Sequence, residues 1–210
     1  MLNTVNLRGV SRGVGQHHGA LRSSLIDAAL ELVAESDAEK VTLRAVARRA
    51  GVSTAAPYHH FPDKDALLAA VACEGFESLG TVQLAVLGGP GSASDLLEEL
   101  VRQYVLFALR HRTHYRLMFR TVPTEVSGDE GVALRKAAST AFSRLSNAVR
   151  EVNPELTADE AGRRALLGWA LAHGAVDVGS WAAALRPDHD AEGLAADVGR
   201  AVRQMAVQPD

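Results

Sequence analysis

The sequence is poor in cysteine and in long apolar runs. Its one cysteine, Cys73, cannot form an internal disulfide, and apolar neighbours at helical spacing predict a packed thiol in a reducing compartment, with a redox-sensing thiol as the alternative. The chain contains no apolar run of about 18 residues, so no transmembrane helix is predicted. The N-terminus lacks the continuous apolar core of a signal peptide. We therefore expect a cytoplasmic protein.

Aromatic residues are also scarce. Phe, Trp and Tyr make up 5% of the 210 residues, whereas hydrophobic residues make up 47%, with Ala and Leu dominant. Ala and Leu favour helices, while β-sandwiches need more β-branched and aromatic residues. The predicted fold class is therefore all-α. The length allows either two domains or one large helical body.

The net charge of -3 is small, which argues against a protein that coats nucleic acid along its whole surface. Residues 1–70 carry eight Lys or Arg against seven Asp or Glu, and the remainder carries fourteen against eighteen. The first third is thus slightly positive and the rest is negative. This distribution is the one expected for an N-terminal part that lies near phosphates.

The pattern of the chain predicts three segments. Residues 1–18 lack periodicity and form a predicted flexible arm, whose Arg8 and Arg12 either enter a DNA groove or belong to an extension without a role. Residues 19–65 and 66–210 form two helical domains. Nine helices are predicted, with no strand and no repeat, over about 20–36, 42–50, 53–60, 63 to at least 79, 94–110, 114–120, 129–152, 157–185 and 191–206.

The second and third of these helices form a predicted helix-turn-helix between about Thr42 and Phe61. The turn between them is Ala50-Gly51-Val52-Ser53, in which Gly51 can take a positive φ and Ser53 can cap the second helix. Such a unit places its second helix in the major groove of DNA. The sequence therefore predicts a DNA-binding function.

The predicted recognition helix, TAAPYHH, is small at its start and aromatic at its end. Its small residues allow a close approach to base edges, and Tyr58, His59 and His60 can donate hydrogen bonds to phosphate. Lys64 supplies a charged contact just beyond it. Pro57 falls in the first turn of this helix, where it removes at most one intrahelical bond.

The run VTLRAVARRAGVSTAAPYHHFPDKDALLAAV resembles the DNA-binding domain of the TetR family of regulators. The resemblance covers about residues 20–72, and it departs from the family at Pro57, where an aliphatic residue is usual, so the base preference does not carry over. The matching positions are Gly51, Val52, Ser53, Tyr58, His59, His60, Phe61 and Lys64. The resemblance implies a ligand-responsive repressor that binds a palindromic operator as a dimer and is released by a small molecule.

The same resemblance implies roles for individual residues. Base edges would face Thr54, Ala55 and His59, while phosphates would meet Thr42, Arg44, Ser53, Tyr58, His60 and Lys64. Other residues of the segment have a plainer interpretation. Leu43, Val52 and Phe61 are expected in the core, and Arg48 and Arg49 could form a solvated face.

The C-terminal part is similar to a second family pattern. WALAHG at 169–174, preceded by HYRLMFR, resembles the Trp-x-x-x-His-Gly motif of one type of TetR C-terminal domain. The predicted ligand-binding residues are Phe76, Tyr104, Phe107, Met118, Phe119, Trp169 and His173. Plain core packing is the alternative for each of them, and the imidazole of His173 could serve a structural hydrogen bond instead of a ligand.

Two further patterns concern dimerisation. Small residues recur along the eighth predicted helix, at Ala161, Ala165, Gly168, Ala172, Ala175 and Gly179, and the last helix has an apolar face of Leu194, Val198, Ala201, Val202 and Met205. We expect these two helices to form a homodimer interface, with packing inside one subunit as the alternative.

Other functional classes lack support. The sequence has no nucleophile elbow, no phosphate loop and no dinucleotide fingerprint, so it predicts no enzyme and no cofactor. His111 and His114 have no Cys or carboxylate at ligand spacing, so no metal site is predicted. The expected partners are double-stranded operator DNA, an unknown small-molecule effector and a second copy, with no membrane. A helical interaction module that has lost DNA binding remains the alternative.

Overall fold

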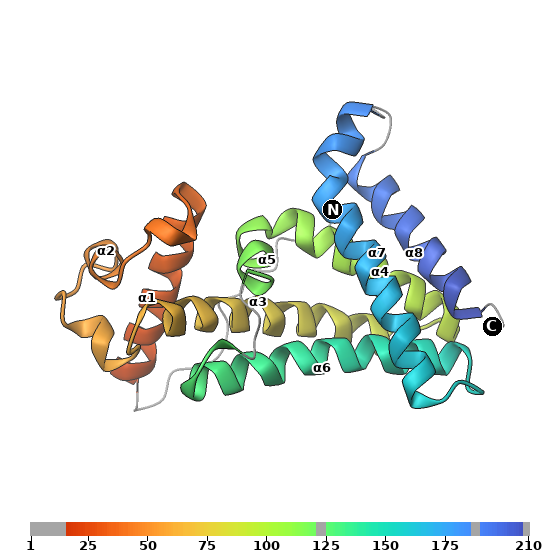
Figure 1. The fold of residues 1–210 in the computed structure, drawn as a ribbon, viewed down its shortest axis with the longest axis horizontal. Coiled ribbons are helices and arrows are strands. Elements are labelled where there is room, and N and C mark those ends of the chain that lie inside the picture. The colour runs from red at the N-terminus through yellow and green to blue at the C-terminus, as the bar shows by residue number, and fades with distance from the viewer. Residues whose placement is uncertain (1–15, 121–124, 186–189, 208–210) are drawn as a thin grey trace. The chain divides into compact units, whose positions relative to one another are not determined.

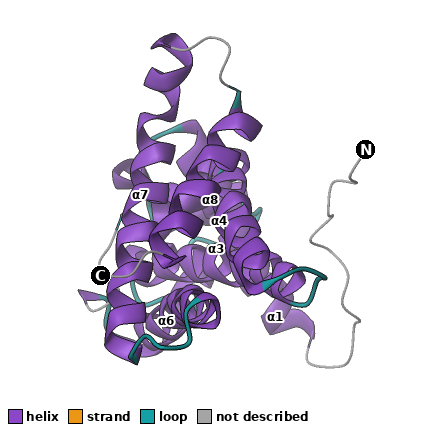
Figure 2. Cartoon of the chain, turned by 90° about the vertical axis from the view of Figure 1, so that its right-hand side faces the viewer, coloured by secondary structure: helices purple, strands orange, loops and turns teal. Residues whose placement is uncertain are grey.

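A computed structural model describes residues 16–120, 125–185 and 190–207 of the chain, and the side chains of 19–120, 125–179 and 190–207. These residues form helices and loops without a strand, which confirms the predicted all-α fold (Figure 2). The chain divides into two compact units, residues 1–64 and 65–210. Most of the predicted arm lies outside the described residues, and its last three positions belong to the first helix.

The first unit, called the head here, consists of α1 (Gln16–Glu35), the short 3-10 helix η1 (Ala38–Lys40), α2 (Leu43–Arg49) and the 3-10 helix η2 (Ala56–His59). Its core is apolar, since Leu25, Ile26, Val46 and Phe61 are all at most 1% exposed. Arg49 of α2 adds a polar link, because its guanidinium bonds the carboxylates of Glu31 and Glu35 on α1. Arg49 therefore ties two helices together and is not a freely solvated charge.

The third predicted helix is wrong in type and extent, because residues 56–59 form a single 3-10 turn. An α-helix capped by Ser53 would need the N–H of residue 57 to reach the Ser53 carbonyl, and Pro57 has no N–H. The Ser53 carbonyl instead accepts from the N–H of Ala56 at 3.0 Å. The N-cap is Ala55, which makes no side-chain cap bond, so the predicted cap by the Ser53 hydroxyl is not formed.

The described residues of the second unit, called the body here, form six helices, whose arrangement is drawn in Figure 1. They are α3 (Lys64–Leu87, from its second residue), α4 (Ala93–Arg110), α5 (Arg112–Met118), α6 (Gly128–Val152), α7 (Ala158–Leu185) and α8 (Ala191–Val207). Capping boxes open two of them. Thr157 and Glu160 form the box before α7, while α4 begins earlier than predicted because Ser92 caps it together with Asp95.

Side-chain bonds join helices that are far apart in the sequence. α3 and α6 run side by side, with Gln83 Nε2 donating to the Ala141 carbonyl and Arg144 donating to the Gly80 carbonyl (Figure 1). α8 packs on α4, and Arg102 of α4 bonds Glu192 of α8. α7 packs on α4 and α6, so that α3, α4, α6 and α7 surround the middle of the body.

The small residues of α7 pack inside the protomer. Ala161, Ala165 and Ala172 are at most 2% exposed, and a Cβ at Gly168 would lie 2.8 Å from Val202 Cγ1 on α8. Val198 and Val202 of the predicted α8 face are buried as well. These small residues therefore serve the alternative that the sequence left open, which is helix packing within one subunit.

α3 is apolar enough by length and composition to cross a membrane, with a window of mean hydropathy 1.2. Half of that window is buried inside the protein, and the helix residues from Ala66 to Cys73 are all buried. α3 therefore has the character of a core helix. The Cys73 thiol is buried in it, as expected for a packed thiol.

Candidate functional site

The turn after α2 has a defined C-terminal cap. Gly51 takes a φ of +70°, its N–H bonds the Arg48 carbonyl, and the Val52 N–H bonds the Ala47 carbonyl. This pair of bonds is the Schellman motif, which needs a left-handed residue at the glycine position. At the other end of α2, the Thr42 hydroxyl accepts from the Ala45 N–H at 3.1 Å. The predicted Gly51 turn is confirmed, and together with the Thr42 cap it fixes where α2 begins and ends.

Most residues predicted to contact DNA are exposed. The exposed residues lie at the start of α2, in the turn and in η2. They are Thr42, Arg44, Ser53, Thr54, Ala55, Tyr58 and His59. Tyr58 is 53% exposed, which makes it an exposed aromatic residue of the head. His60 is half-buried beside Phe61, with ring centroids 6.4 Å apart.

Two buried anchors hold η2 in place. Pro57 is buried, and its carbonyl accepts from the N–H groups of both His60 and Phe61. Phe61 is fully buried, as predicted, with the Arg22 guanidinium 5.3 Å from its ring centroid. The exposed residues between these anchors are therefore displayed on a fixed turn.

Lys64 begins α3 and is half-buried. Its Nζ donates to the Glu39 carbonyl in η1 at 3.3 Å. A lysine ammonium carries three donors, so this bond leaves the charge available to an anion. The bond to Glu39 thus holds the Lys64 ammonium in place near the end of the head.

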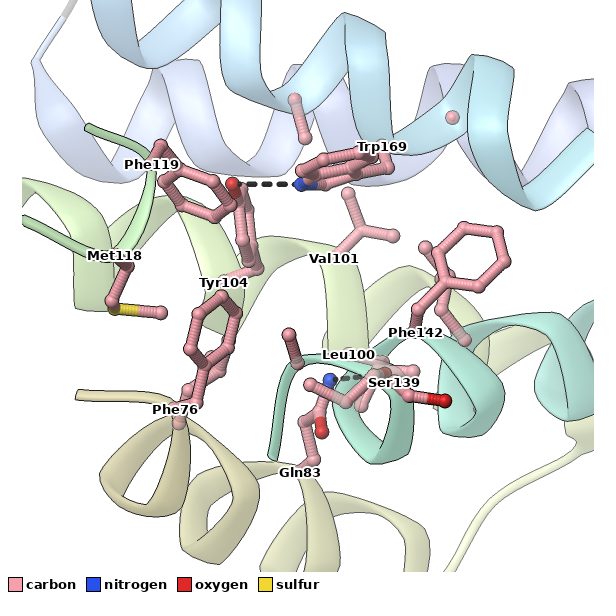
Figure 3. Close-up of a pocket in the computed structure, with 16 residues that line it drawn as sticks. Phe76, Gln83, Leu100, Val101, Tyr104, Met118, Phe119, Ser139, Phe142 and Trp169 are labelled. Atoms are coloured by element: carbon pink, nitrogen blue, oxygen red, sulfur yellow. Dashed lines mark hydrogen bonds between the residues drawn. The ribbon is translucent and has the colours of Figure 1, made fainter. Parts of the chain in front are cut away.

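The body encloses a cavity of about 460 Å³, within the range of small-molecule sites. Five helices line it, and Figure 3 shows aromatic side chains directed into it from α3, α4, α6 and α7. The lining residues are Phe76, Leu79, Gln83, Leu100, Val101, Tyr104, Met118, Phe119, Ala138, Ser139, Ala141, Phe142, Leu145, Gly168, Trp169 and Ala172. No ionisable side chain other than the Tyr104 phenol is among them.

Five of the seven predicted ligand-binding residues line this cavity. They are Phe76, Tyr104, Met118, Phe119 and Trp169. Phe107 is buried elsewhere on α4 and stacks near His111, with ring centroids 4.8 Å apart. His173 lies behind the wall, where its ring packs on Phe119 and Tyr115.

A polar chain runs from the cavity wall to the surface of α7. Trp169 Nε1 donates to the Tyr104 oxygen at 3.0 Å, and the Tyr104 oxygen lies 3.4 Å from that of Tyr115. The Tyr115 oxygen is 2.6 Å from His173 Nδ1, and His173 Nε2 is 3.7 Å from the exposed Asp177 carboxylate. Tyr115 and Asp177 thus lie near the two ring nitrogens of His173, which supports a structural role for this imidazole.

Burial controls the titration of the two tyrosines in this chain. Removal from water penalises the phenolate and raises the pKa of Tyr104 to about 12, against the opposing hydrogen bonds from Tyr115 and Trp169. Burial likewise raises the pKa of Tyr115, and the neighbouring Tyr104 and Asp177 add to the effect. Both hydroxyls therefore remain protonated donors at neutral pH.

Several lining residues were missed from the sequence. Gln83 had a signal, because it lies seven and four residues after Phe76 and Leu79 on the same apolar stripe of α3. Phe142 and its neighbours on α6 had the helical spacing of a core face but no polar residue that marks a site. Tyr115, behind the wall, lies in the HYRLMFR run that resembles the family pattern, but its hydrogen-bond partners come from other helices and could not be predicted.

An apolar strip on α7 faces solvent. Leu167, Leu171 and Val178 are 59%, 41% and 54% exposed, and Gly174 between them is exposed as well. Their spacing of four, three and four residues places them on one helix face.

In the described residues no group of three or more His, Cys, Asp or Glu could hold a metal ion.

Comparison with known proteins gives two family matches. Residues 25–71 match bacterial regulatory proteins of the tetR family, and residues 97–200 match the Tetracyclin repressor-like C-terminal domain. An HTH-type transcriptional repressor of Mycobacterium tuberculosis is 39% identical over 66 residues, which are 31% of this chain and 35% of the relative. The chain thus matches about a third of that relative's length.

Solved structures extend the likeness to nearly the whole chain. A protein of unknown function from Rhodococcus sp. RHA1 has a TM-score of 0.74 and 26% identity, covering 93% of this chain and all of that one. A TetR-family transcriptional regulator from Bordetella parapertussis has a TM-score of 0.66 at 18% identity, covering 87% and 93% of the two chains, and shows the shared fold.

The two family matches together span well over half of the chain, the first covering most of the head and the start of α3 and the second covering most of the body. They do not test the narrower Trp-x-x-x-His-Gly type of C-terminal domain, which stays a prediction. The chain belongs to the TetR family of bacterial regulatory proteins, as the resemblance in its sequence predicted.

Proposed function

We propose that the protein is a transcriptional repressor that binds a palindromic operator as a dimer and releases it when a small molecule fills the body. The observation that carries the proposal is the exposed turn and η2, which the buried Pro57 and Phe61 hold in place and which present the exposed Tyr58. Membership in a family of regulatory proteins agrees with the prediction that the chain is not an enzyme.

In this proposal phosphates meet the polar residues around the turn. Arg44 and Lys64 supply charge, and the Tyr58 hydroxyl supplies a donor. Thr54, Ala55 and His59 face base edges, with Thr42, Ser53 and His60 at the phosphates beside them. The Thr42 hydroxyl already accepts a bond as the α2 cap, so its oxygen would reach phosphate only through its own O–H.

The effector acts through α3. This helix starts at Lys64, the last residue of the head, and three of its later residues, Phe76, Leu79 and Gln83, line the cavity. A molecule that fills the cavity therefore presses on the helix that follows directly from the head. Two recognition elements of a dimer must sit about 34 to 36 Å apart on DNA, so a shift of α3 in each copy would weaken binding.

A second copy binds through α7 and α8 in this proposal. Six of the eleven residues that the sequence pointed to are buried in the protomer and the other five are half-buried, so the proposed contact is made by the more exposed strip of Leu167, Leu171, Gly174 and Val178. Exposed leucines in a helical row are costly in water and are typical of a surface that another chain covers. The site of action is the cytoplasm, where operator DNA lies.

The test begins with selection of binding sites from random double-stranded DNA, followed by fluorescence anisotropy on the recovered duplex at rising salt. Phosphate contacts predict a steep fall of affinity with salt. Arg44→Met should weaken binding and lower the salt slope by about one per lost phosphate contact. Arg112→Met, at an exposed arginine of the body, is the matched control and should leave both unchanged.

The rival function is a helical module that binds another protein and no DNA. Recovery of no enriched sequence, together with no salt-dependent affinity for any duplex, would favour that rival and reject the repressor.

A further inference from the structure

The chemistry of the cavity wall specifies a class of ligand, and this inference rests on the proposed effector function. The wall is apolar apart from Gln83, Ser139, the Tyr104 hydroxyl and the Trp169 indole N–H that donates to it, and it contains no Asp, Glu, Lys, Arg or His. An ionised ligand group would lose its water there without meeting an opposite charge, which is strongly unfavourable. The wall thus selects against anions and cations.

Aromatic residues are concentrated at this wall. The whole chain has five Phe, three Tyr and two Trp, and half of these ten residues line the cavity, from four helices and the end of a fifth: Phe76, Tyr104, Phe119, Phe142 and Trp169. Figure 3 shows the rings of Phe76, Tyr104 and Trp169 arranged around the open space. Rings meet other rings favourably edge to face or offset, so such a wall suits a flat aromatic ligand.

Gln83 provides one directed polar contact. It is 6% exposed, its oxygen accepts from Arg144 Nη1 at 3.3 Å, and its Nε2 donates to the Ala141 carbonyl at 3.2 Å. These two partners fix which end of the amide is nitrogen. The nitrogen carries two N–H groups and the Ala141 carbonyl takes one, so the second can serve a ligand acceptor.

The other polar groups of the wall are already served. The Tyr104 oxygen accepts from Trp169 and lies within hydrogen-bond distance of Tyr115 and His173. Ser139 is exposed, so solvent competes with a ligand for its hydroxyl. Gln83 is therefore the wall residue with a buried donor to spare among the described residues.

We propose that the effector is an uncharged aromatic molecule with one hydrogen-bond acceptor, such as a carbonyl oxygen, which accepts from Gln83 Nε2. The closest competing chemistry is an anion that displaces Gln83 and pairs with Arg144, the half-buried guanidinium behind it. Arg144 already donates to both Gln83 and the Gly80 carbonyl, so such an anion would have to break two bonds.

The test is a displacement assay on the full chain with the uncharged dye N-phenyl-1-naphthylamine, whose fluorescence rises in apolar surroundings. Three competitors share one ring system: methyl 2-naphthoate, the hydrocarbon 2-sec-butylnaphthalene of similar shape, and ionised 2-naphthoate. We expect the ester to displace the dye, and the anion to bind at least about thirtyfold more weakly than the ester.

The Gln83→Leu variant isolates the hydrogen bond. The ratio of ester affinity to hydrocarbon affinity should fall by about five- to tenfold in this variant, because only the ester loses a bond. Gln103→Leu is the matched control, since Gln103 bonds Glu99 on α4 outside the cavity, and it should leave the ratio unchanged. Dye binding by Gln83→Leu itself shows that the variant is folded.

Three outcomes would overturn the inference: anion binding as tight as that of the ester, an unchanged ratio in Gln83→Leu, or no dye binding by the wild-type chain. Anion binding that is lost in Arg144→Met would identify the competing chemistry. Operator binding is measured on the same preparation without ligand. If the chain binds DNA but fails the dye series, only the ligand class is rejected. If it passes the dye series but binds no DNA, the repressor function is rejected.

Discussion

Gly51 is a residue whose substitution has a single physical cost. Its φ is +70°, and a Cβ built there would have no atom within 4 Å, so steric crowding is absent and only the left-handed backbone opposes a side chain. We predict that Gly51→Ala lowers the free energy of unfolding by about 1 to 2 kcal/mol. Urea denaturation followed by circular dichroism measures this change.

Gly19 offers the matched control for that substitution. It also has open space around its Cβ position, but it lies within α1 and has no positive φ. Gly19→Ala should therefore raise stability by up to about 1 kcal/mol, since Ala is the better helix former. Equal effects of the two substitutions would contradict the backbone explanation.

Tyr104 allows a prediction about alkaline pH. Its pKa is raised to about 12 in the folded protein from an ordinary value of 10.0, so its contribution to stability is fully present below pH 10. That contribution is lost as pH rises from about 10 through 12, because the unfolded chain releases the proton first. We expect the free energy of unfolding to fall over this interval, by about 2 to 3 kcal/mol from this group.

Ultraviolet titration of the phenolates tests this directly. The absorbance step of Tyr104 should appear near pH 12 in the folded chain and be missing from Tyr104→Phe, whose stability should also fall less between pH 10 and 12. Ionisation of all three tyrosines near pH 10 in the folded protein would refute the burial of Tyr104.

At the scale of residues, the sequence predicts best what depends on near neighbours. The Gly51 turn and the Thr42 and Thr157 caps involve residues within a few positions, so composition and spacing suffice to predict them. Gln83 and Tyr115 act through partners 58 to 61 positions away. Such contacts depend on how helices pack, which the pattern of one segment does not encode.

At the scale of elements, eight of the nine predicted helices are α-helices in the described residues, and the short 3-10 helix η1 was not predicted. The exception is residues 53–60, where the composition around Ser53 favours a cap but Pro57 removes the N–H that the first α-helical bond requires. The small residues of α7 show a different limit. Their spacing predicts a close helix approach correctly, but it cannot say whether the approaching helix belongs to the same chain.

Gly168 tests that close approach. Its Cβ would lie 2.8 Å from Val202 Cγ1, and Val202 is 1% exposed, so the valine has little room to move. We predict that Gly168→Ala lowers the free energy of unfolding by about 1 to 3 kcal/mol. Thermal or urea unfolding of the body measures it.

Gly162 on the same helix is the control. Its Cβ would meet only Ser146 Oγ at 4.0 Å, which is ordinary contact. Gly162→Ala should therefore stabilise the chain by up to about 1 kcal/mol through helix propensity. Destabilisation by both substitutions would mean that α7 tolerates no change and that Val202 is not the cause.

At the scale of the whole molecule, surfaces and cavities are the features that the sequence predicts least. The cavity draws its wall from five helices, and only the residues that are aromatic or contain sulfur stood out beforehand. The exposed α7 strip was not predicted either, because which face of a helix stays exposed depends on the helices that pack against it. A charged substitution on the strip is therefore the most direct test of whether a second copy covers it.

Leu167→Glu should convert the proposed dimer to a monomer in analytical ultracentrifugation. Leu167 is 59% exposed in the protomer, so the carboxylate is tolerated in the single chain but would be stripped of water in an interface without a partner charge. Val132→Glu is the matched control, because Val132 is 57% exposed on α6. It should leave the dimer intact.

The same two variants connect assembly to DNA binding. A monomer contacts one half-site, so Leu167→Glu should lose most of its affinity for a palindromic duplex while keeping the circular dichroism of a folded protein. Val132→Glu should bind like the wild type. If Leu167→Glu remains dimeric, α7 does not form the interface through this strip; if it is monomeric and still binds the palindrome at full affinity, the two half-sites are not read together.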